Sequence, residues 1–121
     1  MLKAAIAVGG YARSNARELV GLVQTAERLG VDSVWSAEAW GSDAVTSLAY
    51  LAAKTERIKI GSGILLLPQR DPVVLAKELA GIDVLSKGRL LVGIGVGYVP
   101  GEFEALGIPY EERGARTNEH I

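Results

Sequence analysis

The sequence predicts an α/β protein with a parallel sheet. Four short apolar runs begin near residues 4, 32, 58 and 90. Each of the first three is followed by a segment with the apolar spacing of a helix, and the fourth leads through a loop to the start of another helix. Parallel strands joined by helical crossovers are the common way to accommodate this alternation, so we expect a βα unit repeated four times.

The first two units have clear boundaries. Residues 4–8 form an apolar run that ends at Gly9–Gly10, and the helix that follows begins with a capping-box pattern at Asn15 and Glu18. Gly30 provides its C-terminal stop. Residues 31–37 form the second strand. Its helix is capped by Ser42–Asp43 and ends near Lys54, where a cation suits the helix dipole.

The third strand begins at Ile58 as a β-branched apolar run, which is typical of a strand buried on both faces. Gly61 and Gly63 interrupt it, and glycine in a strand indicates a bulge, a bend or a close-approaching ligand. The stretch ends at Asp71–Pro72, an acidic N-cap with proline at the first helical position, and the helix runs to about Ser86. A strand that opens a gap at its C-terminal end is where α/β proteins bind ligands.

The fourth strand is expected over residues 90–97, again opening into glycines. A loop containing Pro100, Phe103 and Pro109 should follow, and then the first one or two turns of a helix from Arg113. If the four units are half of a barrel, the first and fourth strands are sheet edges with one free side each, which favours pairing with a second chain.

Composition narrows the class of protein. The 121 residues are 49% hydrophobic and 22% charged with a net charge of -1, which predicts one globular domain. Nothing in the charge pattern favours nucleic acid or an anionic membrane as partner. There is no cysteine, so disulfides, thiolate metal sites and a cysteine nucleophile are excluded. The N-terminal apolar run is too short for a signal peptide, and we expect a cytoplasmic protein that acts on a small molecule and carries no metal.

Two folds can be built from these units. One is a flavodoxin-like or dinucleotide-binding sheet, and the other is half of a (β/α)8 barrel, whose complete form needs about 250 residues. The dinucleotide fingerprint is absent, because the glycines of residues 93–97 lack its spacing and precede a loop with Pro100. Residues 9–12 are also poor in the hydroxyl donors that a phosphate loop of a flavodoxin-like module would use.

Three segments decide between the folds by resemblance: residues 29–35 before Glu38, residues 55–64 and residues 85–97. In this order they resemble the bacterial luciferase-like superfamily of flavin- and coenzyme F420-dependent oxidoreductases. Two later segments, residues 102–107 and 112–117, resemble the same group. The resemblance covers essentially the whole chain. It implies that residues 1–121 are a single partial domain, the N-terminal four βα units of a TIM-like (β/α)8 barrel.

The resemblance also implies a site at the C-terminal ends of the strands. The cofactor is coenzyme F420 as first choice, or FMN, and it carries the hydride or activates dioxygen. Residues 62–64 correspond to the family's bulge behind the cofactor ring, which often holds a non-prolyl cis peptide, predicted here at Gly63–Ile64. The expected cofactor-binding residues are Ala37, Glu38, Ser62, Gly63, Ile64, Gly95, Val96 and Gly97.

Glu38 is the predicted catalytic residue, because the family places a polar or acidic side chain facing the cofactor at the end of strand two. It could instead cap the helix turn at Ser42–Asp43 or bind a neighbouring arginine. Trp40 could stack near the cofactor or pack a loop. Gly95 and Gly97 could admit the cofactor ring or simply end the strand.

Three residues near the end of the sequence have simpler interpretations. Arg113 and Arg116 are expected in ion pairs at a helix start, and His120 is expected to be solvated. The histidine that some relatives have after the strand-two acid is replaced by Ala39–Trp40, and no acid lies near residues 95–97. The sequence therefore leaves the proton donor unassigned.

Two functions stay open. The first is a portion of an oxidoreductase or monooxygenase that transfers a hydride to, or activates dioxygen on, a small organic substrate. The second is a half-barrel without a site of its own that works only on assembly with another chain. Pairing through the exposed strand edges would make such a protein a homo-oligomer.

Overall fold

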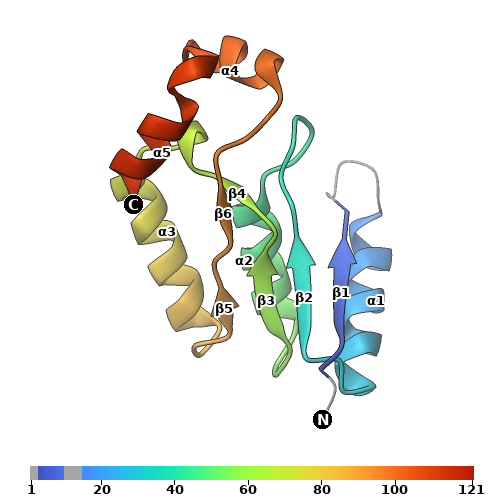
Figure 1. The fold of residues 1–121 in the computed structure, drawn as a ribbon. Coiled ribbons are helices and arrows are strands. Elements are labelled where there is room, and N and C mark those ends of the chain that lie inside the picture. Colours follow the sequence, from blue (N-terminus) through green and yellow to red (C-terminus); the bar gives the residue numbers. More distant parts are fainter. Residues whose placement is uncertain (1–2, 10–14) are drawn as a thin grey trace.

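The computed structural model describes residues 3–9 and 15–121 and confirms the alternation of strands and helices (Figure 1). Gly10, part of the predicted turn after the first strand, and most of the loop over residues 9–12 lie outside the described residues. The elements along the chain are β1 Ala5–Val8, α1 Ala16–Arg28, β2 Ser33–Ser36, α2 Ala44–Lys54, β3 Lys59–Ser62, β4 Leu65–Leu66, the 3-10 helix η2 Leu67–Gln69, α3 Pro72–Leu85, β5 Leu90–Leu91, β6 Ile94–Gly95, α4 Pro100–Leu106, the 3-10 helix η3 Tyr110–Glu112 and α5 Arg113–His120.

The sheet is parallel and its strands follow the order β1-β2-β3-β5. Above it, β4 and β6 pair in parallel and continue the third and fourth strands. In doubly wound flavodoxin-like sheets the first strand lies inside the sheet, whereas here it lies at one end. The sequential order is that of a barrel wall. Within the described residues β1 and β5 are the two edges, which confirms that prediction.

The three long helices begin where their capping residues predict. The Asn15 side chain accepts a hydrogen bond from the Arg17 amide, and the Asp43 carboxylate accepts one from the Thr46 amide. Asp71 accepts two, at 2.9 and 3.0 Å, with Pro72 at the first helical position. These caps satisfy backbone donors that have no partner within the helix, so local sequence alone fixes the helix starts.

The hydrophobic core lies between one face of the sheet and the helices packed on it. Figure 1 shows α1 and α2 behind the sheet, α3 beside its β5 edge, and α4 and α5 above the C-terminal ends of the strands. The core side chains are contributed by alternate strand positions and by the facing helix stripes: Val8, Leu19, Val23, Ala26, Val34, Leu48, Leu51, Ala52, Ile58, Ile60 and Ile82. Helices α1, α2 and α3 contribute side chains to this core, whereas Ala5 and Ala7, on the other face of β1, are exposed. That other face corresponds to the interior of a barrel.

A side chain on the interior face of the sheet, the face opposite the core, explains why one of the strand residues is glycine. Trp35 projects from β2 over Gly61 of β3, and a Cβ atom on Gly61 would lie 2.6 Å from the indole ring. The indole Nε1 donates to the Ser33 hydroxyl at 2.9 Å, which fixes the ring along its own strand. The gap that Gly61 leaves is therefore filled by a neighbouring strand.

Two predictions for the fourth unit were wrong. The expected continuous strand over residues 90–97 is two pieces, β5 and β6, because Gly93 lies so close to the Ser62 carbonyl that a side chain would overlap it. The expected loop contains the helix α4, with Pro100 at its first turn and Gly107 as a left-handed C-cap. A helix of seven residues is too short to show a repeated apolar stripe in the sequence.

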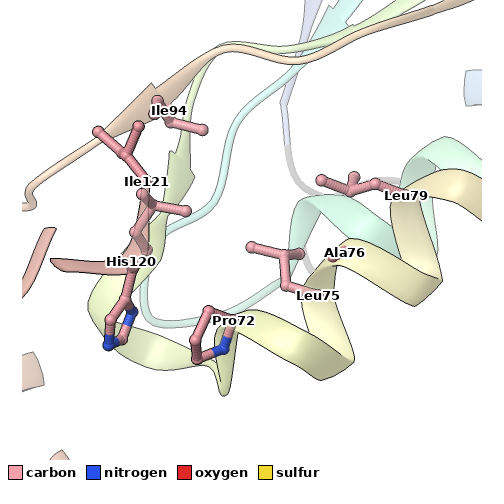
Figure 2. A pocket seen from close by; sticks show the side chains of 8 residues that line it. Pro72, Leu75, Ala76, Leu79, Ile94, His120 and Ile121 are labelled. Atoms are coloured by element: carbon pink, nitrogen blue, oxygen red, sulfur yellow. The ribbon is translucent and has the colours of Figure 1, made fainter. Parts of the chain in front are cut away.

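An apolar groove of about 230 Å³ lies between α3 and the end of α5, next to β6. Figure 2 shows Pro72, Leu75, Ala76 and Leu79 of α3 on one side of it, opposite Ile94, His120 and Ile121. His120 was expected to be solvated, and this was wrong. Its ring is partly buried in the groove, and its Nδ1 atom is buried without a hydrogen-bond partner among the described residues.

None of the helices in the described residues has the length and apolar character needed to cross a bilayer.

Candidate functional site

Glu38 organises the C-terminal ends of the second and third strands. Its side chain is 1% exposed. One carboxylate oxygen accepts hydrogen bonds from the Leu66 amide and from Arg70 Nη1, and the other accepts from the Ala44 amide and Arg70 Nη2. The carboxylate thus joins the end of β2 to β4, to the start of α2 and to the residue after η2.

Arg70 is the charge partner of Glu38, with nitrogen–oxygen distances of 2.8 and 2.9 Å in a bidentate pair. A second carboxylate, on Asp43, lies 3.6 Å from the guanidinium. Burial by itself would lower the pKa of Arg70, but the hydrogen bonds and charge of Glu38, helped by Asp43 and Glu78, raise it above its ordinary value. The pair is a fixed ionic support under the strand ends.

This geometry matches both alternatives to a catalytic Glu38, namely capping of the α2 turn and binding of a neighbouring arginine. The catalytic role stays a prediction, and the structure commits both carboxylate oxygens to bonds within the protein.

The Ser62–Gly63–Ile64 segment is the predicted bulge. The Gly63–Ile64 peptide is cis, which confirms that prediction. The Ser62 hydroxyl donates to the Gly93 carbonyl at 2.8 Å and accepts from the Gly93 amide at 2.9 Å. These bonds tie the third strand to the fourth where the two strands change from β3–β5 pairing to β4–β6 pairing. Ile64 follows directly and remains 37% exposed.

Gly95 and Gly97 have separate structural reasons. A Cβ atom on Gly95 would overlap Cδ1 of Ile64, so the space beside this glycine is occupied by the bulge side chain. Gly97 has a φ of +81°, where side chains are rarely tolerated. Both observations favour the interpretation that these glycines shape the strand end.

A hollow of about 310 Å³ opens beside the bulge. It brings together four of the predicted site residues, Glu38, Ile64, Val96 and Gly97. The remaining lining residues are Ala39, Leu66, Tyr98, Val99 and Glu102. The other four predicted residues, Ala37, Ser62, Gly63 and Gly95, do not line it. The hollow is largely apolar and has Glu38 and Glu102 as its two acidic residues.

Glu102 was missed by sequence reasoning. It lies in α4, is 5% exposed, and accepts a hydrogen bond of 2.7 Å from the Trp40 amide. It also lines a second hollow of about 350 Å³ on the side of Trp40. The available sequence signal was Pro100 as a helix start with an acidic residue in the first turn. Because the segment was interpreted as a loop, Glu102 had no predicted position.

Trp40 has the packing contact that the simpler of its two interpretations expected, but the contact is with a helix and covers only part of the ring. Its ring lies against Gly101 at the start of α4, although 65% of the residue stays exposed. Arg116 forms the expected ion pair, at 2.8 Å to Glu112. Arg113 instead donates to the Tyr110 carbonyl and lies over the Tyr110 ring.

The model of one protein family, described as luciferase-like monooxygenase, matches residues 1–121 of the chain. The chain belongs to this family. The fold of this chain is similar to that of a solved monooxygenase, RslO1 of Streptomyces bottropensis. The TM-score is 0.90 and the sequence identity is 33%. That similarity covers 98% of this chain and 40% of RslO1.

Two curated relatives of the chain are named for different cofactors. A Mycobacterium tuberculosis protein named as a coenzyme F420-dependent oxidoreductase is 39% identical over 100 residues, covering 83% of this chain and 29% of the relative. The oxygenase component of the flavin-dependent trigonelline monooxygenase of Acinetobacter baylyi is 32% identical over 112 residues, covering 86% and 31%. The chain therefore spans about a third of the length of the curated relatives that it matches.

Proposed function

We propose that residues 1–121 form the N-terminal half-barrel of an oxidoreductase that binds coenzyme F420, as first choice, or FMN, and acts on a small organic substrate. The observation that carries the proposal is the bulge. Ser62 fixes the segment to Gly93, and Ile64 faces a largely apolar hollow at the C-terminal ends of the strands. This is the end of such sheets where ligands bind. Relatives named for F420 and for flavin support the choice of cofactor.

The residues present fit a flat ring. Ile64, Leu66 and Val96 give the hollow an apolar wall, and Glu38, which lines the same hollow and is paired with Arg70, accepts a hydrogen bond from the Leu66 amide. The cofactor would supply the hydride chemistry. The chain would hold the ring against Ile64 and keep water from that side of it.

Titration of the purified chain with F420 and with FMN, followed by cofactor fluorescence, tests the proposal. We expect saturable binding that falls roughly tenfold or more in Ile64→Asp, since a carboxylate there must be desolvated against the ring. Val92→Asp is the matched control, because Val92 is also exposed and lies just before Gly93 but does not line the hollow. Absence of binding, together with binding by a full-length relative, would remove the cofactor site from this chain. Equal losses in the two variants would contradict the role of Ile64.

A second candidate function rests on the open sheet. With β1 and β5 as edges and Ala5 and Ala7 exposed on the interior face, the chain could be a half-barrel that gains a site only by pairing with a second copy. Sedimentation distinguishes the two. A homodimer that binds cofactor only in the dimeric state would favour assembly, and a monomer that binds cofactor would exclude it.

A further inference from the structure

The two hollows at the strand ends share two lining residues, Ala39 and Glu102, and Glu102 is the charged one. We propose that the hollows bind the substrate, and that they select a molecule with a flat apolar body and an amine or hydroxyl group over one that carries a carboxylate or phosphate. The proposal rests on the proposed function, since it names the substrate class of the same strand-end site. Three features support it: an acceptor oxygen on Glu102, the charges that line the hollows, and the exposed rings of Trp40 and Tyr98.

The acceptor is the second carboxylate oxygen of Glu102. Only the first oxygen has a hydrogen-bond partner among the described residues, the Trp40 amide at 2.7 Å. By contrast, Glu38 at the same end of the sheet accepts four hydrogen bonds. This oxygen is not one of the described buried atoms that lack a partner, so it is open to solvent at the hollows although the residue as a whole is only 5% exposed. A ligand N–H or O–H in either hollow would replace water as its donor.

The charged side chains that line the two hollows disfavour an anionic ligand. The hollow beside Trp40 is lined by two carboxylates, Asp43 and Glu102, and the hollow beside the bulge by Glu38 and Glu102. No lysine, arginine or histidine is among the described residues that line either one. The neighbouring Arg70 is paired with Glu38 and Asp43. A ligand carboxylate or phosphate would therefore meet negative charge without a described cation to pair with.

The aromatic surfaces are Trp40 and Tyr98, one in each hollow. They are 65% and 82% exposed, which is high for side chains of this size. Exposed rings beside an acceptor bind flat apolar groups, and they attract cations through the ring face. The hollows of about 350 and 310 Å³ are each large enough for a small molecule of this kind.

Three probes of matched shape test the proposal without any cofactor: 2-phenylethylamine, 2-phenylethanol and 3-phenylpropionate. The readout is the NMR shift of the Trp40 amide, whose proton is donated to Glu102. We expect affinity to fall in the order amine, alcohol, carboxylate, with roughly a tenfold difference or more between the first and last. Equal or tighter binding of 3-phenylpropionate, or no saturable shift with any probe, would overturn the proposal.

Glu102→Gln separates ligand recognition from folding. The glutamine oxygen can still accept from the Trp40 amide, but the charge is lost, so the amine should lose its advantage over the carboxylate. Glu104→Gln is the matched control, since Glu104 is exposed on the same helix and lines neither hollow. Glu104→Gln should retain the wild-type order. Retention of that order in Glu102→Gln would contradict the assignment.

The outcome is independent of the cofactor test. Selective amine binding without F420 or FMN binding would remove the oxidoreductase proposal and keep the ligand class. Cofactor binding with loss of the amine preference would keep the oxidoreductase proposal and reject the substrate class.

Discussion

The two ends of the sheet use their charged side chains differently. At the N-terminal end, one oxygen of Glu27 accepts from the amides of Glu56, Arg57 and Ile58 at 2.6–2.9 Å. Nearby, the Arg89 guanidinium donates five hydrogen bonds, four of them to backbone carbonyls and one to the Thr55 hydroxyl. These side chains hold loops and helix ends together.

At the C-terminal end the acidic residues are divided between two roles. Glu38 is saturated by Arg70 and two amides, whereas Glu102 keeps one oxygen without a partner among the described residues and lines two hollows. Charge at the N-terminal end therefore stabilises the fold, while part of the charge at the C-terminal end is left open for the proposed ligand. This agrees with the placement of active sites on (β/α)8 barrels.

The largest effect is expected from Glu38→Gln. An amide cannot balance the Arg70 charge, and its NH2 group faces donors, so the free energy of unfolding should fall by about 3–5 kcal/mol. Urea denaturation measures the change. Cofactor affinity should fall with it, because Leu66 in the wall of the hollow loses its support.

The double variant Glu38→Gln with Arg70→Met is the control for this prediction. It removes the guanidinium that Gln leaves unbalanced and keeps a side-chain acceptor at position 38 for the Leu66 and Ala44 amides, so part of the stability lost in Glu38→Gln should be recovered. If Glu38→Gln were as stable as the wild type, or the double variant less stable than Glu38→Gln, the ionic support would have no role in the fold.

A smaller effect, about 2 kcal/mol, is expected from Arg89→Lys at the other end. Lysine keeps the charge but lacks the planar fork that reaches five acceptors at once. Urea denaturation should show the loss, and the shift of the Trp40 amide with 2-phenylethylamine should be unchanged. A parallel loss of amine affinity would show that the two ends of the sheet are coupled and do not have separate roles.

Local signals explain which parts of the fold the sequence predicted. Asp43 and Asp71 bond amides within three residues of themselves, so their helices could be placed from the chain alone. The cis peptide at Gly63–Ile64 was predicted by resemblance to a family. The helix α4 was missed because its buried residues, Glu102 and Phe103, are adjacent and form no repeat.

Contacts distant in the sequence explain the rest. The gap at Gly61 is filled by Trp35, 26 positions earlier, and that at Gly95 by Ile64, 31 positions earlier. A glycine indicates close approach but not the group that approaches. Similarly, the sequence offered both a catalytic and a structural Glu38, and only the position of Arg70, 32 residues later, shows where the carboxylate is directed.

The smallest effect, about 1 kcal/mol at neutral pH, is expected from Glu27→Gln, because this carboxylate is only partly buried and water screens its hydrogen bonds. Burial by itself would raise the pKa of Glu27, but the amides of Ile58, Arg57 and Glu56 hold it below its ordinary value. A depressed folded-state pKa stabilises the protein above the unfolded-state pKa, and the contribution is lost as the pH falls through the folded-state value. The stability difference between wild type and Glu27→Gln should therefore be present at neutral pH and shrink on acidification.

Urea denaturation at a series of pH values measures that difference, with Glu104→Gln as an exposed control whose stability should follow the wild type at every pH. A difference that grew on acidification would contradict the sign of the pKa shift. Binding of 2-phenylethylamine at neutral pH should be unaffected in Glu27→Gln. Because Glu102→Gln should do the reverse, losing the amine preference with little loss of stability, the two carboxylates together test whether the ends of the sheet have separate roles.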